Sequence, residues 1–267
     1  MGKSMTILAG LLAVLATTGA DGPPTAVPGD FRLQVASYGL GKEPVYTEEI
    51  VVRSGRAYVL PSNSKEVVII EPARGRLEIL DVGRRIQAEV SFTALDASVA
   101  KLKASLREVA EGLERKGGRA NEIEAKMARN LFEPNLAIGA TSKPNRLRLT
   151  NPAVEIDAEG EPEPDAPRLS MIAAVLGSIA RLGAFRTPQD LPPFAELEAI
   201  AALTGERRQR PTELVYLYRL AGPPRKFRRT YKLNPTRTDR EVEAIARVDR
   251  LREVAPSVRY ERYRPAR

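Results

Sequence analysis

The sequence predicts an α+β fold in which one open, curved antiparallel sheet (a half-barrel) is covered on its concave face by helices. Short segments of alternating apolar residues follow one another between residues 31 and 90, with turn-forming residues between them. Their connections are too short for a crossover helix, so the strands should run antiparallel. Apolar helical patterns follow, and strands return near residue 212. Those helices would cover the apolar face that an open sheet cannot leave exposed.

The first 20 residues have the layout of a secretory signal peptide. Lys3 supplies a positive charge, residues 6–16 form an uncharged apolar run, and small residues precede a cleavage site after Ala20. The run is shorter than the roughly 18 residues of a spanning helix, which disfavours the alternative of a membrane anchor. We therefore expect cleavage after Ala20, a secreted or periplasmic protein, and a flexible lead-in rich in Pro and Gly at residues 21–30.

Six strands are expected in the first part of the chain. The first alternates Phe31, Leu33 and Val35 with polar or small residues, which is typical of a half-buried strand. The VVII segment at residues 67–70 is apolar at every position, so this strand should be covered on both faces. The expected strands lie at residues 31–37, 45–53, 56–60, 65–70, 76–80 and 84–90.

A long helix should follow, with a capping box at Thr93 and Asp96 and an end at Gly117–Gly118. Its apolar residues recur every three or four positions, which favours packing on the sheet; a coiled-coil dimer is the alternative. The stripe consists of Leu95, Val99, Leu102, Leu106, Val109 and Leu113. A shorter helix is expected over residues 121–132.

The second half of the chain mixes loops, helices and strands. Residues 146–150 and 153–157 are strand-like. The acidic stretch 159–165 is expected to be a solvated loop, and a hinge in a two-lobed molecule is the alternative. Residues 168–185 are apolar almost all round, which indicates a buried core or cavity helix. A helix over residues 193–205, opened by two prolines and ended by Gly205, a hairpin at 212–220 and 226–233, and a charged helix at 239–254 complete the prediction. We expect one domain over residues 31–253, and residues 254–267 as a basic tail or an edge strand.

Composition argues against most kinds of catalysis. The chain of 267 residues has no His and no Cys, which removes the usual zinc and copper ligands and the commonest neutral-pH general base. It also has no Trp, only 5% aromatic residues, and no nucleotide-binding or nucleophile motif. A spatial pair of carboxylates, as in glycosidases, stays open. We expect a non-enzymatic protein with no cofactor and no metal site.

The order of these parts resembles the periplasmic lipoprotein-carrier (LolA-like) superfamily. The resemblance rests on the signal peptide, on the opening strands with Tyr46 and the segment KEVVIIEPARGRLEILD at residues 65–81, on the middle apolar helix, and on the late return to strands. The carriers of that superfamily are half-barrels that hold acyl chains under covering helices. The resemblance therefore implies an apolar cavity here, and a lipid or lipoprotein acyl chain as partner.

Alternation along the opening strands selects a candidate ligand face, although each of its residues could instead be plain core. The candidates are Phe31, Leu33, Val35, Ile50, Val52, Tyr58 and Leu60. The helix at 168–185 would either fill the concavity or move aside for an acyl chain.

Positive charge is concentrated near the C-terminus. Residues 205–267 contain 18 Lys or Arg against 8 Asp or Glu, whereas the whole chain carries +8. The densest groups are Arg207, Arg208, Arg210, Arg225, Lys226, Arg228, Arg229 and Lys232. They could form an ordinary solvated face, or could dock an anionic envelope surface or a protein partner. No nucleic-acid-binding motif is present, so nucleic acid is not expected as a partner.

Overall fold

The structure is a computed structural model that describes residues 29–62, 64–139, 141, 143–186, 192–219, 223–234, 238–260 and 263. The expected signal peptide and most of the expected lead-in lie outside the described residues. No helix in the described part of the chain combines the length and the apolar character needed to cross a bilayer.

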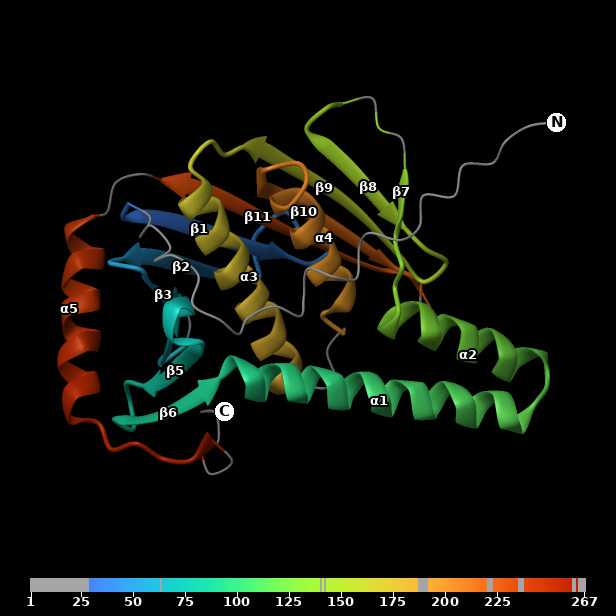
Figure 1. The fold of residues 1–267 in the computed structure, drawn as a ribbon, viewed down its shortest axis with the longest axis horizontal. Coiled ribbons are helices and arrows are strands. Elements are labelled where there is room, and N and C mark those ends of the chain that lie inside the picture. Colours follow the sequence, from blue (N-terminus) through green and yellow to red (C-terminus); the bar gives the residue numbers. More distant parts are fainter. Residues whose placement is uncertain are drawn as a thin grey trace.

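One open sheet of 11 antiparallel strands organises the molecule, which confirms the predicted fold class (Figure 1). Its order is β6-β5-β4-β3-β2-β1-β11-β10-β9-β8-β7, so the opening strands form a meander, as their short connections predict. The strands are β1 (Phe31–Tyr38), β2 (Tyr46–Arg53), β3 (Arg56–Pro61), β4 (Glu66–Glu71), β5 (Arg76–Asp81), β6 (Ile86–Ser91), β7 (Ala137–Gly139), β8 (Arg146–Thr150), β9 (Val154–Pro162), β10 (Gln209–Tyr218) and β11 (Arg225–Asn234). A single turn of 3-10 helix, η1 (Pro72–Arg74), joins β4 to β5.

The β1–β11 ladder joins the two halves of the sheet. It runs from the pair Arg32 and Asn234 to the pair Tyr38 and Arg228. Without it the meander β1–β6 and the strands β7–β11 would be two separate sheets. Nothing local in either segment predicts this pairing, since the partners lie at opposite ends of the chain.

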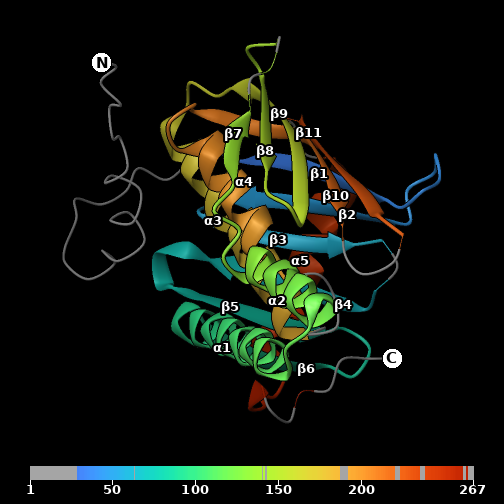
Figure 2. The same ribbon diagram turned by 90° about the vertical axis from the view of Figure 1, so that its right-hand side faces the viewer.

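Two helices lie in the concavity of the sheet (Figure 2). They are α3 (Ala166–Arg186) and α4 (Phe194–Thr204). Ile172 and Val175 of α3 and Ile200 of α4 are at most 3% exposed and join the sheet's inward side chains in one large core. The nearly all-apolar pattern of α3 therefore has a simple cause, because the helix is enclosed by the sheet and by its neighbouring helices.

The convex face is covered over β2–β5 by α5 (Asp239–Val254). Ile245 and Val248 of this helix pack on Val51 and Ile69, among other residues. Every residue of β4 is buried, so the prediction that this strand is covered on both faces is confirmed. The Thr238 side chain accepts from the Glu241 amide, and Glu241 returns the bond in a capping box that starts α5.

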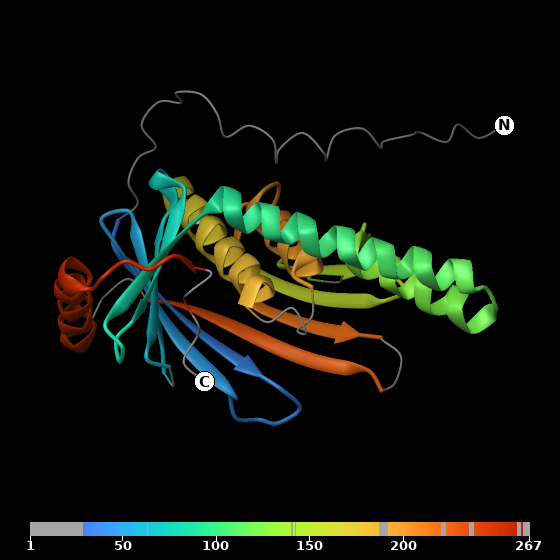
Figure 3. The same cartoon turned by 90° about the horizontal axis from the view of Figure 1, so that it is seen from below.

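The helix pair α1 (Phe92–Lys116) and α2 (Arg119–Phe132) corrects an expectation. These helices form an antiparallel hairpin that projects past the strands instead of lying along the sheet (Figure 3). Of the predicted stripe only Leu95 is buried, and Val109 is 56% exposed. Ala110, Ala125 and Phe132 close a small core of their own, because small side chains let the two helices approach closely. Ser91, not Thr93, caps α1, and its hydroxyl accepts from the Ala94 amide.

The acidic stretch 159–165 is not a solvated loop, which is a second correction. Its first half continues β9 to Pro162, and Glu163 is only 5% exposed. The Asp165 carboxylate accepts from the backbone amide of Arg168 at 3.0 Å and so caps the first turn of α3. The acidic stretch therefore extends β9 and caps the first turn of α3.

The segment after α5 returns to the sheet at the β6 edge. Ser257 makes a parallel bridge with Gln87, and the Val258 amide donates to the Gln87 carbonyl at 2.8 Å. Tyr263 is 3% exposed and its hydroxyl donates to Glu66 at 2.6 Å. The pairing of Ser257 and Val258 with Gln87 covers part of the β6 edge, whose backbone groups would otherwise be unpaired.

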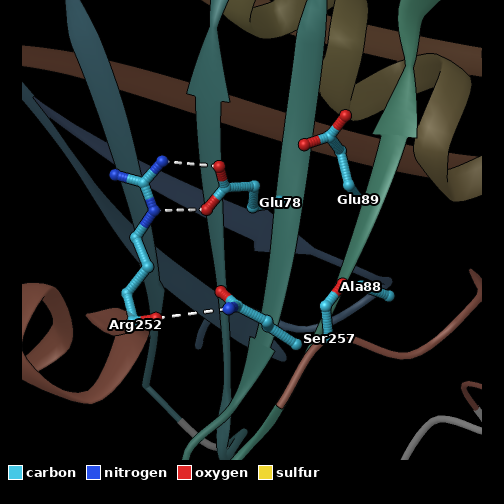
Figure 4. A pocket seen from close by; sticks show the side chains of 6 residues that line it. Glu78, Ala88, Glu89, Arg252 and Ser257 are labelled. Atoms are coloured by element: carbon cyan, nitrogen blue, oxygen red, sulfur yellow. Dashed lines mark hydrogen bonds and ion pairs between the residues drawn. The ribbon is translucent and has the colours of Figure 1, made fainter. Parts of the chain in front are cut away.

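Arg252 fastens α5 and this segment to the convex face (Figure 4). Its guanidinium makes two hydrogen bonds to the Glu78 carboxylate, and it also lies 3.5 Å from Glu71. Glu71 and Glu78 are 2% and 7% exposed, so both need cationic partners. The Gln87 amide adds a bond to the Ala255 carbonyl at 2.9 Å.

We predict that Arg252→Ala lowers the free energy of unfolding by about 2–3 kcal/mol, because it leaves Glu78 buried without this partner. Denaturant unfolding measures the change. Arg250→Ala, an exposed arginine on the same helix, is the control and should change stability by less than about 0.5 kcal/mol. Equal effects of the two substitutions would show that the Arg252–Glu78 pair does not fasten the helix.

Candidate functional site

Five of the seven candidate ligand-face residues lie together on the concave face. Phe31, Leu33, Val35, Ile50 and Val52 are each at most 2% exposed. In this structure α3 and α4 fill the space in front of them, so these residues are core. Any apolar ligand would have to enter between the sheet and α3.

The other two candidates, Tyr58 and Leu60, lie on the convex face, which corrects their assignment. Tyr58 pairs with Val51 across the β2–β3 ladder, and residues directly opposite each other share a face. Both Tyr58 and Leu60 pack in the α5 core. The two-residue turn at Ser54 and Gly55 sets this register, so alternation could not simply be carried on from β2.

The eight candidate basic residues do not form one surface. Arg207 donates to the Pro144 and Arg146 carbonyls at 3.3 Å, and Arg210 is ion-paired with Glu161. These residues stand at the start of β10, whereas Arg225 pairs with Tyr218 at its other end, roughly 25 Å away along the strand. The candidates that are exposed are Arg207, Arg208, Arg225, Lys226 and Lys232.

The remaining two basic candidates, Arg228 and Arg229, point to opposite faces of β11. The Arg228 guanidinium lies 4.0 Å from the centre of the Tyr38 ring on the convex side. Arg229 faces the concavity, where it forms an ion pair with Glu196 of α4 and donates from Nε to the Ser37 hydroxyl at 3.3 Å. Arg229 is therefore part of the interior wall and not of a docking surface.

Around Arg229 the concave face carries a band of polar side chains, which we call the rim cluster. Its members are Tyr46, Glu48, Glu196, Tyr216, Arg229 and Tyr231. Cross-strand pairing places them in rows, because Ser37 faces both Tyr46 and Arg229. In the next row Val35 faces both Glu48 and Tyr231. The cluster thus borders the apolar core directly.

Burial controls the protonation of the rim cluster. Desolvation raises the pKa of Tyr216 and of Tyr231, so both hydroxyls stay protonated and neutral. Desolvation also raises the pKa of the Glu48 carboxyl, which is only partly offset by Arg229 and by the 3.1 Å hydrogen bond from the Tyr46 hydroxyl.

Two buried hydroxyls in this cluster lack partners. Tyr216 and Tyr231 are 5% and 4% exposed, and neither hydroxyl completes a hydrogen bond within the part of the chain that the structure describes. Arg229 approaches the Tyr231 hydroxyl and lowers its pKa through its charge and a hydrogen-bonding contact, although the geometry of that contact is not that of a completed hydrogen bond. Buried polar groups are nearly always satisfied by protein, water or ligand. These two hydroxyls therefore mark a place where an external oxygen would be stabilised.

Aromatic rings line the same place. The rings of Tyr216 and Tyr218 stack with their centres 6.3 Å apart, and Phe227 meets Tyr218 edge-on at 6.4 Å. A polar band with aromatic walls that continues into an apolar core matches a molecule with a polar head and an apolar chain. The band is composed of side chains from β2, β10, β11 and α4.

Two hollows of about 320 Å³ lie elsewhere on the described surface. One is lined by Glu78, Gln87, Ala88, Glu89, Arg252 and Ser257 (Figure 4). Two of its charged groups, Arg252 and Glu78, already bond to each other and hold α5 on the sheet. We therefore regard the rim cluster as the better candidate site.

Sequence reasoning missed the rim cluster, although a signal for it exists. Arg229 stands in the inward series of β11 with Phe227 and Tyr231, and Glu48 stands in the inward series of β2 with Ile50. A charged residue at a position that should face the core is the pattern that would have found them. The contribution of α4 has no such signal.

The raised pKa of Glu48 predicts a pH effect on stability. Between the ordinary glutamate pKa of about 4.3 and the raised pKa of Glu48, the folded chain keeps the proton on this carboxyl whereas the unfolded chain has released it. The contribution of Glu48 to stability therefore falls as pH rises through this window. Glu48→Gln should therefore stabilise the protein at pH 7 relative to the parent, and less so at pH 4. Denaturant unfolding across this range measures the difference.

Glu124→Gln, at an exposed position of α2, is the control and should leave the pH profile of stability unchanged. A Glu48→Gln variant with the parent's profile would contradict the prediction.

Comparisons with known proteins add no relative. No protein-family model matches this chain, and no curated protein is similar enough in sequence to count as a relative.

Proposed function

We propose that the protein binds an amphiphile, with the apolar chain between the sheet and α3 and the polar head at the rim cluster. The observation that carries the proposal is the pair of buried, unpartnered hydroxyls of Tyr216 and Tyr231 at the polar end of an apolar concavity. An oxygen of the head group would accept hydrogen bonds from them. The chain would continue along the core behind them.

Entry of a chain requires α3 to move. The polar attachments of α3 include the Arg181 Nε, which lies 3.0 Å from an Asp96 oxygen, Arg186, which lies 3.0 Å from Glu66, and Arg168, which pairs with Asp165 and Glu163. The Arg181–Asp96 pair is largely exposed and contributes on the order of 1 kcal/mol or less. What holds α3 is mainly the burial of its apolar side chains.

An acyl chain can replace that burial. Five apolar side chains of α3 belong to the main core: Met171, Ile172, Val175, Leu176 and Leu182. At about 2 kcal/mol each their burial contributes about 10 kcal/mol. A 16-carbon chain with about 15 methylenes contributes a similar amount at ~0.8 kcal/mol each. The exchange is therefore close to balanced, which suits reversible loading.

The resemblance to LolA-like carriers supports the same proposal, since those half-barrels hold acyl chains under covering helices. On this proposal the protein is a secreted or periplasmic carrier without catalytic activity. Lipid exchange between membranes would be its role, and mass spectrometry of lipids that co-purify with it would identify the cargo.

We predict that delipidated protein takes up a fluorescent 16-carbon fatty acid and shields it from water. The Tyr216→Phe, Tyr231→Phe double variant should bind this fatty acid about 5- to 30-fold more weakly, because two hydrogen bonds to the head group are lost. Binding of a hydrocarbon probe without a head group should be unchanged. Fluorescence titration measures both affinities.

Tyr58→Phe is the matched control, since Tyr58 lies on the convex face with its hydroxyl bonded to Asp249 at 2.9 Å. It should not change either affinity. A parent protein that shields neither probe would refute the proposed function, and a double variant that binds both probes like the parent would refute the role of the hydroxyls.

A further inference from the structure

The loop between β1 and β2, residues 39–45, exposes apolar side chains. Leu40 is 91% exposed, more than any other large apolar side chain in the described residues, and Val45 is 69% exposed. Both flank Lys42, which is also exposed. Single exposed apolar residues are ordinary, but two on one short loop call for a partner.

A second exposed segment lies beside this loop. Tyr38 and Arg228 are the last pair of the β1–β11 ladder, so the loop that follows Tyr38 adjoins the start of β11. There Arg225 and Lys226 are exposed and Phe227 is 39% exposed. Figures 2 and 3 both show the β1–β2 loop and the start of β11 at the same end of the sheet.

We call the combined surface the loop patch. It comprises Leu40, Lys42, Val45, Arg225, Lys226 and Phe227. It contains three apolar tips and three cations, and Glu43 is the acidic residue within the loop. Apolar tips of this kind enter the interfacial layer of a bilayer, while Lys and Arg beside them attract anionic headgroups. The mixture is less suited to a protein partner or a second copy, because like charges would face one another in a symmetric contact.

The loop patch borders the rim cluster. Tyr46 follows the loop directly, and Phe227 precedes Arg229 by two residues on the same inward face of β11. We propose that the loop patch docks on a bilayer surface rich in anionic phospholipid and brings the polar end of the concavity to the membrane. This inference goes beyond the proposed function and stands without it, since docking requires no cargo.

The absence of Trp from the chain allows a direct test. Leu40→Trp introduces a single fluorophore into the loop patch. Ile138→Trp, at a 65% exposed position on the β7 edge, is the matched control. Each protein is mixed with vesicles of equal parts phosphatidylglycerol and phosphatidylcholine, and with vesicles of phosphatidylcholine alone.

We predict a blue shift of the Leu40→Trp emission and quenching by brominated lipid with the anionic vesicles, and neither effect for Ile138→Trp. Adding Arg225→Glu and Lys226→Glu to Leu40→Trp should weaken vesicle binding at least tenfold, as should high salt. This variant also controls for the apolar run at residues 6–16, which is the same in every protein compared.

Equal signals from the two tryptophans, or a charge reversal without effect, would overturn the proposal. A blue shift that depends on protein concentration without vesicles would assign the patch to self-association instead. The charge-reversal variant should still bind the fluorescent fatty acid like the parent, so failure to dock and failure to carry lipid are separable outcomes.

Discussion

The apolar concave face of the sheet must be kept from water, and α3 and α4 are the elements that do this. A soluble protein rarely exposes a continuous apolar surface of such size. The inward side chains of β1 and β2 are nearly inaccessible, and they share one core with Ile172 and Val175 of α3 and with Ile200 of α4. The apolar character of α3 and the curvature of the sheet therefore depend on each other, and both set where a ligand could go.

The convex face is treated differently on its two sides. Over β2–β5 it is apolar and lies under α5, which Arg252 fastens to Glu78. Over β8–β11 it carries charged pairs such as Arg146 with Glu159, and needs no helix. The part of the sheet from β2 to β5 therefore has an apolar core on both faces, whereas the part from β8 to β11 has its apolar core on the concave face.

Much of the fold could be predicted from local patterns, because strands and helices each bury one face at a fixed period. The meander, the two-sided burial of VVII at residues 67–70 and the buried helix at 168–185 followed in this way. Features set by distant contacts did not. The β1–β11 ladder has no local signal, and the regular stripe of residues 95–113 fits an αα-hairpin as well as a helix on a sheet.

The candidate site was harder to predict than the fold for the same reason. Its apolar wall followed from alternation, except where the tight turn at Ser54 and Gly55 changed the register and placed Tyr58 outside. Its polar end, the rim cluster, combines residues from four elements. The charged residues Glu48 and Arg229 at inward-facing strand positions are the sequence signal from which it could have been predicted. The eight candidate basic residues do not share one surface, because charge density along a chain does not say which way each side chain points.

The central ladder has a consequence for how the chain matures. Ser37 and Arg229 meet across it although they are 192 residues apart, so this seam can close only when nearly the whole chain has been made. Until α3 has been synthesised, the nascent β1–β6 meander exposes its apolar concave face and the unpaired edge of β1. That early segment is the natural client for a holding chaperone, and the place where aggregation of a newly made molecule would begin.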